Sequence, residues 1–400
     1  MRAETRVLLH DFGGYPFTIQ LARELAKRKL TVRYLYYSNL TGPRGSMALT
    51  PKDPPSLFVN PITTKRPFSR YRYRQRILQE IEYGLKVARV MGSYRQDVVI
   101  SANTPPISQC LITLTARAKR CRSLVWVQDI FSIATGSILA VRIGILGSLA
   151  AKVIGGLERA TLRNSEQIVS ISPAFSRYLI ESGINEESIE TIQNWAPLEE
   201  LAYFEQKPGS WAAGHGLPNA FRFLYSGALG DKHDPDSLLG LAEHFRADPH
   251  IQIVVVSEGK GADYLVSQKM QRKLSNLFVF PYQPFEYVPV MMADCDVLLA
   301  TLTVEAAAYS VPSKILSYLT AGRPILALLD PSNLAARLVS KSGAGIVIPP
   351  DDYSGFLAVA DSLSKDAAKR RVMGAKGRAF AERTFDIRTI ADRFEQLIGQ

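Results

Sequence analysis

The chain has 400 residues, 46% hydrophobic and 21% charged, with a formal net charge of +11. This composition is typical of a globular protein and excludes a disordered or collagen-like chain, and the length favours two domains of roughly 180–200 residues each. Three cysteines without metal-binding spacing argue against a disulfide scaffold. No uncharged apolar run reaches the ~18–20 residues that span a bilayer, and no signal peptide is recognisable, so we expect a cytoplasmic protein.

The whole excess of positive charge lies in the first quarter of the chain. Residues 1–100 hold 18 Lys and Arg against 7 Asp and Glu, whereas residues 101–200 hold 9 of each and residues 201–400 hold 21 of each. A block at 65–76 contains cations and no acid: Lys65, Arg66, Arg70, Arg72, Arg74 and Arg76. Such a block favours an anionic partner, either nucleic acid or the cytoplasmic face of a membrane.

The first half of the chain alternates strands with helices. A short apolar strand at 6–10, a glycine turn at 11–16 and an amphipathic helix precede a second strand at 32–37, which predicts a parallel sheet. Further strands are expected at 97–101, 123–127, 167–171 and 188–192, and helices near 75–91, 107–119, 138–164 and 173–182.

The second half repeats the alternation after a stretch at 196–219 that is rich in Gly and Pro and is predicted to be a linker. Strands are expected at 221–225, 251–256, 277–280, 297–302, 324–329 and 345–348, and helices at 235–245, 287–293, 313–321 and 334–340. We therefore predict two α/β domains, residues 1–200 and 215–379. A ligand cleft is expected at the carboxyl ends of both sheets.

The sharpest motif is the start of the helix at 313–321. Pro312 and Ser313 mark its beginning, and the free N–H groups of a helix N-terminus favour an anion. Lys314 places a cation in the first turn, where the helix dipole disfavours it and a bound phosphate would offset that penalty. The alternative is an ordinary helix with a solvated lysine.

Two glycine turns follow predicted strands. Gly227, in a loop that also holds Lys232, follows the first strand of the second half, and Gly13 and Gly14 follow the first strand of the chain. Glycine there permits close approach of a phosphate, although any strand-to-helix turn favours it. Neither turn is a GxGxxG or P-loop motif.

Polar residues at other strand ends are weaker candidates. Asn103, Asp129 and Asn194 lie where sugar hydroxyls could bind, or they serve only as turn and capping residues. No HExxH or GxSxG motif is present.

Several segments in the same order resemble glycosyltransferase family 4, in the branch of colanic-acid and O-antigen biosynthesis assigned to fucosyl and N-acetylfucosaminyl transfer. The segments are VPSKILSYLTAGRPIL (311–326), DFGGYPFTIQLARELAKR (11–28), VWVQDIF (125–131), TIQNWAP (191–197), LYSGALGDKH (224–233), VVVSEGKGADYL (254–265) and NLFVFPYQPFEYVPVMMADCDVLLATL (276–302). The resemblance spans nearly the whole chain.

The resemblance implies a GT-B fold, with two Rossmann-like domains, the donor held mainly by the second domain and a last helix, 380–400, returning to the first. It implies a retaining transfer from a GDP- or UDP-sugar to a lipid-linked glycan in bacterial surface polysaccharide biosynthesis. Neither a metal ion nor a cofactor is expected.

The resemblance also implies roles for residues. Ser313, Lys314 and Lys232 match the donor-phosphate site, where the lysines would stabilise the charge of the leaving diphosphate. Gly13 and Gly14 match the loop over the diphosphate, and Asp129 and Asn194 match contacts to the reacting sugar or acceptor. The remaining substrate-binding candidates are Asn103, Gly227, Glu258, Pro281 and Tyr282, the last two where the nucleobase packs.

One departure concerns the two glutamates, eight positions apart, that many members carry around this helix. Tyr309 and Ser317 stand at those places, and Glu305 lies four residues before Tyr309. The departure indicates either a variant donor site or weakened catalysis. A non-catalytic sugar-nucleotide-binding partner of a transferase therefore stays a possible alternative, as does a sugar-nucleotide epimerase of the same fold.

The block at 65–76 then has an expected partner, the anionic membrane that carries a lipid-linked acceptor on its cytoplasmic face. Three cations in one sector of the helix at 138–164, Lys152, Arg159 and Arg163, agree with membrane docking. The alternatives are a solvated loop and a helix that only packs on the sheet. Binding to nucleic acid rests on charge alone, and no nucleic-acid partner is expected.

Overall fold

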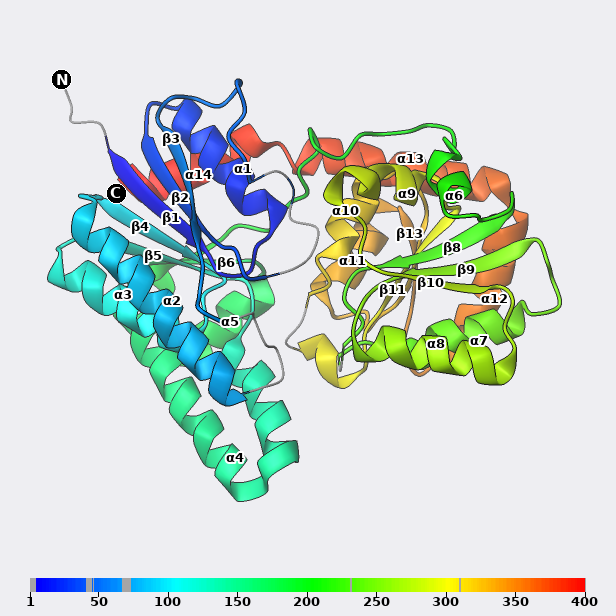
Figure 1. Ribbon diagram of the computed structural model, residues 1–400, viewed down its shortest axis with the longest axis horizontal. Coiled ribbons are helices and arrows are strands. Elements are labelled where there is room, and N and C mark those ends of the chain that lie inside the picture. Colours follow the sequence, from blue (N-terminus) through cyan, green and yellow to red (C-terminus); the bar gives the residue numbers. More distant parts are fainter. Residues whose placement is uncertain are drawn as a thin grey trace. The chain divides into compact units, whose positions relative to one another are not determined.

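The computed structural model describes residues 5–40, 45, 47–66, 73–230, 232–308 and 311–399, without the side chains of residues 73, 134–146, 307 and 308. The chain forms two compact units, Met1–Asn194 with Ile387–Gln400, and Trp195–Asp386. Each unit contains one parallel sheet with helices on both faces (Figure 1).

The sheet of the first unit has the strand order β3-β2-β1-β4-β5-β6-β7, and every pair is parallel. The strands are β1 (Arg6–Asp11), β2 (Thr31–Tyr37), β3 (Leu57–Ile62), β4 (Val98–Ala102), β5 (Arg122–Val127), β6 (Gln167–Ser170) and β7 (Ile189–Thr191). The order reverses between β1 and β4. Such a reversal is the switch point at which ligands bind in doubly wound sheets.

Helices cover both faces of this sheet. They are α1 (Pro16–Lys27), α2 (Tyr73–Ser93), α3 (Pro106–Ala118), α4 (Phe131–Arg163), α5 (Pro173–Glu181), the short 3-10 helix η1 (Glu186–Ser188) and α14 (Ile387–Gly399). Tyr83 of α2 and Ile112 of α3 join one hydrophobic core with Val99 of β4. On the opposite face, the Trp126 ring lies 5.0 Å from that of Phe394 in α14.

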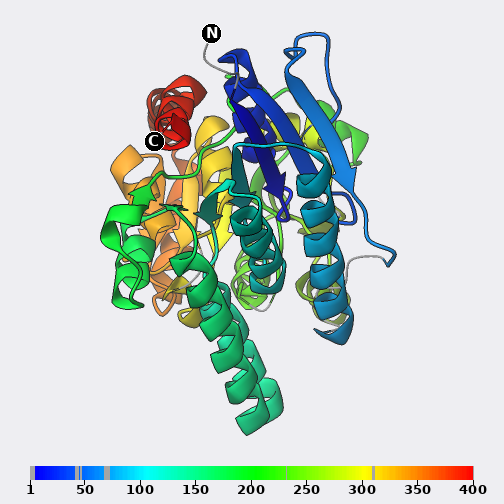
Figure 2. The same cartoon turned by 90° about the vertical axis from the view of Figure 1, so that its left-hand side faces the viewer.

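Helix α4 doubles back on itself. The backbone N–H groups of Phe131 and Ser132, at its start, donate to the Glu158 carboxylate at 3.0 and 3.1 Å. A straight helix would separate these residues by about 40 Å, since each residue adds 1.5 Å. Figures 1 and 2 show the two limbs running out from the sheet and back.

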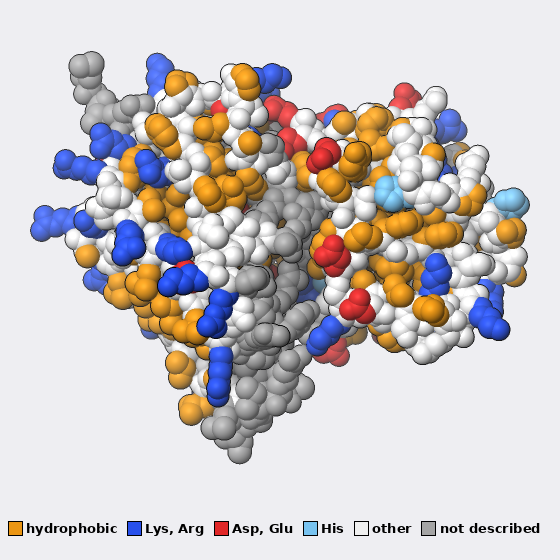
Figure 3. All heavy atoms as spheres, in the orientation of Figure 1, with side chains coloured by type: hydrophobic (Ala, Val, Ile, Leu, Met, Phe, Trp, Pro, Cys, Tyr) orange, Lys and Arg blue, Asp and Glu red, His pale blue; other side chains and the backbone are white. Residues whose placement is uncertain are grey.

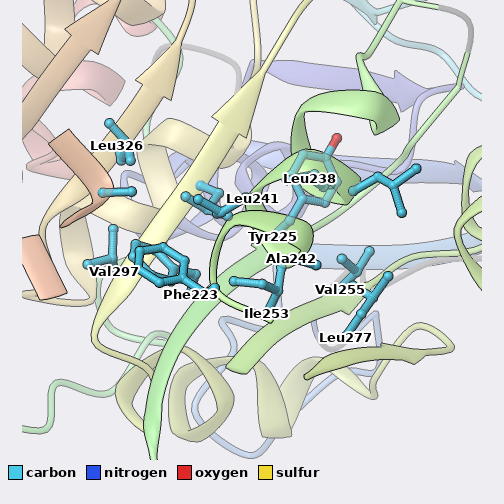
Figure 4. Packing of buried hydrophobic residues seen from close by; sticks show 14 of the residues in the cluster. Phe223, Tyr225, Leu238, Leu241, Ala242, Ile253, Val255, Leu277, Val297 and Leu326 are labelled. Atoms are coloured by element: carbon cyan, nitrogen blue, oxygen red, sulfur yellow. The ribbon is translucent and has the colours of Figure 1, made fainter. Parts of the chain in front are cut away.

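The sheet of the second unit has the order β10-β9-β8-β11-β12-β13, again all parallel. The strands are β8 (Phe221–Ser226), β9 (Ile251–Val256), β10 (Leu277–Phe280), β11 (Val297–Thr301), β12 (Ile325–Leu328) and β13 (Gly345–Ile348). The order reverses between β8 and β11. Figure 4 shows the core under this point, where Phe223 and Tyr225 of β8 pack against Leu238 and Leu241.

The helices of the second unit connect these strands. They are α6 (Ser210–Gly214), α7 (Pro235–His244), α8 (Lys260–Arg272), α9 (Val288–Ala293), α10 (Lys314–Thr320), α11 (Leu334–Ser342), α12 (Tyr353–Lys365) and α13 (Ala367–Thr384), with the 3-10 helices η2 (Phe285–Tyr287) and η3 (Glu305–Ala308). Asp234 caps α7 as the sequence predicts, accepting from the N–H groups of Asp236 and Ser237.

The predicted α/β class with two Rossmann-like sheets is confirmed, and three local features differ from expectation. Residues 196–219 belong to the second unit, because Trp211 and Leu217 there are buried. The expected last helix, 380–400, is two helices, α13 and α14, broken at Phe385 and Asp386, and α14 is the part that joins the first unit. Strand β3 was not expected, because it contains a proline and half of its residues are exposed.

Candidate active site

The donor-site candidates of the second unit lie at the switch point of its sheet. Gly227 follows β8, Lys232 lies in the same loop, and Lys314 begins α10. The N–H of Thr303, after β11, donates to the Lys232 carbonyl at 3.1 Å, which ties that loop to the neighbouring strand. Three segments distant in sequence therefore meet at one edge of the sheet.

The ammonium group of Lys314 is buried, although the residue as a whole is half-buried. Its Nζ lies 3.4 Å from the centre of the Tyr225 ring and has no hydrogen-bond partner. Burial, followed by the nearby charge of Lys232, holds the pKa of Lys314 well below its ordinary value. The ring face attracts the ammonium but cannot replace the hydrogen bonds of water, so an anion placed here would be strongly stabilised.

Gly227 makes room for this lysine. Its φ is +125°, which side chains other than glycine rarely adopt, and a Cβ would lie 3.3 Å from Lys314 Cε. The Tyr318 hydroxyl accepts from the Ser226 N–H at 2.9 Å and so fastens α10 to the end of β8. Burial raises the pKa of Tyr318, which keeps the hydroxyl neutral in this role.

Two further buried groups at this edge were missed by sequence reasoning. The hydroxyls of Ser257, after β9, and Thr301, at the end of β11, have no hydrogen-bond partner. The available signal was a polar residue directly after β9 and another at the last position of the apolar strand β11. Because buried polar groups are nearly always hydrogen-bonded, unpartnered hydroxyls at this edge of the sheet indicate a polar ligand or ordered water.

The other predicted donor residues that the structure describes are exposed or half-buried. Glu258 is exposed and accepts from the Tyr282 N–H at 3.2 Å, next to Pro281. Ser313 is the N-cap residue of α10 and makes no side-chain cap bond, and Ser317 is half-buried one turn later. Tyr309 lies outside the described residues, whereas Glu305 is described, exposed and part of η3.

In the first unit, Asp11 organises the glycine loop after β1. Its buried carboxylate accepts from the N–H groups of Gly13, Gly14 and Tyr15 at 2.7–3.0 Å and from the Thr18 hydroxyl at 2.6 Å. Burial raises the pKa of Asp11, and these four hydrogen bonds work in the other direction. The sequence pattern singled out the glycines and missed the carboxylate that holds them.

A small pocket opens beside this loop, between the ends of β4 and β5 and the second limb of α4. It is lined by Asn103, Gln109, Gln128, Asp129 and Glu158, among others. Both amide atoms of Gln128 and the Asn103 Oδ1 are buried without a hydrogen-bond partner. Asn103 has φ +45°, a strained value for a non-glycine residue.

Asn194, the last residue of the first unit's main segment, lies outside this pocket. Its Oδ1 is also buried without a hydrogen-bond partner.

The block at 65–76 is only partly described. Lys65, Arg66 and Arg74 are exposed, whereas Arg76 is half-buried and pairs with Glu80 at 3.0 Å. Arg70 and Arg72 lie outside the described residues.

Comparison with known proteins decides the family. The family described as glycosyl transferase 4-like domain matches residues 13–195, and the family described as glycosyl transferases group 1 matches residues 211–380. The chain belongs to the GT-B glycosyltransferases. The resemblance to this family that the sequence motifs predict is thereby confirmed, as is the assignment to an enzyme class.

Individual relatives of this glycosyltransferase are distant. The Escherichia coli K12 protein WcaI, named as a colanic acid biosynthesis glycosyl transferase, is 24% identical over 251 residues, 62% of this chain and 60% of WcaI. WbjE of Pseudomonas aeruginosa, named as a glycosyltransferase, is 21% identical over 271 residues, 67% of this chain and 66% of WbjE. The match thus spans about three fifths to two thirds of the length of these curated relatives.

Solved structures show the same fold over the whole glycosyltransferase chain. Anabaena HepE, crystallised with UDP and glucose, superposes with a TM-score of 0.72 at 15% identity, covering 99% of this chain and 100% of HepE. At this identity the likeness establishes the fold, and the roles of single residues stay predictions.

Proposed function

We propose that the second unit binds the diphosphate of a nucleotide-sugar donor at the edge formed by Gly227, Lys232 and Lys314. The observation that carries the proposal is the buried Lys314 ammonium, which has no hydrogen-bond partner and lies near a second lysine. Burying an unpaired charge costs several kcal/mol in a protein. A diphosphate would offset this cost and supply the acceptors that the ammonium lacks.

Charge on the leaving diphosphate grows as the bond to the sugar breaks. Lys232 and Lys314 would stabilise that charge more in the transition state than in the bound donor, which is the condition for catalysis. Ser313, Ser317, Glu258, Pro281 and Tyr282 are proposed to complete the donor site.

The reaction we propose is retaining transfer of a sugar from a GDP- or UDP-sugar, without a metal ion, to a lipid-linked glycan. The name of WcaI supports a role in bacterial surface polysaccharide synthesis, and the UDP bound to HepE supports a nucleoside diphosphate donor. Asn103, Asp129, Asn194 and the Gly13–Gly14 loop are proposed to contact the substrates in the first unit. The unpartnered Asn103 Oδ1 and the unpartnered amide of Gln128 suit sugar hydroxyls, which both donate and accept.

We further propose that the enzyme works on the cytoplasmic face of the membrane, with the block at 65–76 attracted to anionic lipid. Each exposed cation near such a surface contributes about 1 kcal/mol at low salt.

The test is calorimetric titration of UDP, GDP and a panel of their sugars, followed by a transfer assay with lipid-linked acceptors. Lys232→Met is expected to weaken nucleotide binding at least about tenfold, since a hydrogen bond to a charged group contributes about 1.5–3 kcal/mol. Lys341→Met, which removes an exposed lysine on α11, is the matched control. Equal binding by all three proteins would refute the proposed site, and binding without turnover would favour a non-catalytic partner.

A further inference from the structure

Helix α2 carries apolar residues on its outward side as well as on the side that faces the core. Leu78 and Leu85 are 57% and 54% exposed, and Ile77 on the same side is also exposed. Gln79 and Glu80, on the side that packs on the sheet, are 2% and 7% exposed. Tyr83, Val87 and Met91 of the same helix face the core, so the exposed apolar residues are additional to those that a helix covering a sheet has to bury.

The neighbouring helices repeat this pattern. Helix α3 contacts α2 on one side and α4 on the other, and α2 and α3 pack on the same face of the sheet. Leu114 of α3 and Leu149 and Val153 of α4 are between 59% and 65% exposed. Over the region of α2 and α3, Figure 3 shows hydrophobic side chains interspersed with Lys and Arg.

The charges among these apolar residues are of one sign. The exposed cations are Arg74 and Arg89 on α2, Arg117 and Lys119 at the end of α3, and Lys152 and Arg159 on α4. Helix α3 contains no acid.

The described acids of α2 and α4 are already engaged. Glu80 pairs with Arg76, Glu82 pairs with Lys86, and Glu158 accepts from two backbone N–H groups of α4. The exposed side of these helices is therefore apolar and cationic.

We propose that this surface, the outward sides of α2 and α3 with residues 148–163 of α4, docks on an anionic lipid bilayer. Aliphatic side chains between cations suit the boundary between lipid headgroups and acyl chains, where apolar burial and attraction to anionic lipid act together. A nucleic acid would match the cations but not the leucines, and an acidic protein would have to supply an apolar face as well.

The docking would be peripheral, since among the described residues no helix is long and apolar enough to cross a membrane. The surface deepens the proposed function, because it rests on the proposal that the enzyme works on the cytoplasmic face of the membrane. It does not depend on sugar transfer, and of its exposed cations only Arg74 belongs to the block at 65–76, where attraction would be through charge alone.

The experiment is co-sedimentation of the full-length protein with vesicles of phosphatidylcholine alone and of phosphatidylcholine mixed equally with phosphatidylglycerol. The triple variant Leu78→Gln, Leu85→Gln, Leu114→Gln removes the apolar component and keeps every charge. The matched control is Val266→Gln, Met270→Gln, Val372→Gln, which changes three exposed apolar residues of the second unit. Melting curves and calorimetric binding of UDP and GDP check that both variants fold.

Wild type and control are expected to bind the anionic vesicles, and the triple variant to bind them at least about tenfold more weakly. Equal binding by the triple variant would overturn the proposal and assign the attraction to charge alone. Failure of wild type to bind these vesicles, or its capture only by an acidic protein, would also overturn it. If neither the wild type nor the variants bind UDP or GDP, the proposed donor site is refuted, whereas the proposed docking surface is not affected.

Discussion

Replacing Lys314 by methionine should have opposite effects on stability and on donor binding. Methionine keeps most of the side chain's length and its packing against Tyr225 while removing the buried ammonium. Substituting apolar residues for buried charged groups often stabilises a protein by about 1–4 kcal/mol. We expect a gain within this range, because Lys314 Nζ has no hydrogen bond that the substitution would remove.

The gain should depend on pH in a defined direction. In the unfolded chain the pKa of lysine is about 10.4, and in the folded protein burial and the charge of Lys232 hold the pKa of Lys314 well below that value. Between these two pKa values the unfolded chain binds more protons, so the stability of the wild type rises with pH. The advantage of Lys314→Met should therefore be largest at low pH and disappear as the pH approaches about 10.

Donor binding should weaken at the same time. Loss of a charged hydrogen bond to the diphosphate costs about 1.5–3 kcal/mol, which is roughly 10- to 150-fold in the Kd for UDP or GDP. Urea unfolding at several pH values measures the first effect, and titration calorimetry measures the second. A Lys314→Met protein that is less stable than wild type at neutral pH, or that binds both nucleotides unchanged, would refute this account of the site.

Three other substitutions or reactions give independent checks. Asp11→Ala leaves three backbone N–H groups without their acceptor, while the Thr18 hydroxyl can still donate to the Tyr15 carbonyl. The free energy of unfolding in urea should therefore fall by about 2–4 kcal/mol, and an unchanged midpoint would contradict the role of this carboxylate. In Gly227→Ala, the alanine has to adopt φ +125° with its Cβ against Lys314. Calorimetry should show both lower stability, by about 1–3 kcal/mol, and weaker UDP or GDP binding. Wild-type values for both would be inconsistent with a close contact between residue 227 and Lys314. Burial raises the pKa of Cys121 to about 11 and that of Cys295 to about 12. Only the half-buried Cys110 should therefore react readily with a thiol reagent in the native protein at neutral pH. Three thiols that react equally fast would argue against the burial of Cys121 and Cys295.

The alternation of apolar strands and amphipathic helices was sufficient to predict both sheets, because buried parallel strands read as continuous apolar runs. Strand β3 was missed because it lies at the sheet edge, where few of its residues are buried. The reversal in α4 was invisible for a different reason. The Glu158 carboxylate, which accepts a hydrogen bond from the Phe131 N–H at the start of this helix, lies 27 residues further along the chain.

The donor-site candidates illustrate the same limit. Glycines and lysines at strand ends predicted a donor site at the carboxyl edge of the second sheet, because residue type and position along a strand are visible in the sequence. The lack of a partner for Lys314 Nζ, and the buried hydroxyls of Ser257 and Thr301, depend on what surrounds them in three dimensions. Asp11 was likewise overlooked because its importance lies in the five donors it accepts from.

In the proposed donor site, the two lysines and Gly227 would contact only the diphosphate, the part that all nucleotide sugars share with the spent nucleotide. Such a contact would not distinguish one sugar from another, and it would hold the more highly charged product at least as firmly as the donor. Accumulating nucleoside diphosphate would then inhibit the enzyme competitively. Redesign of its sugar preference should leave these three positions untouched.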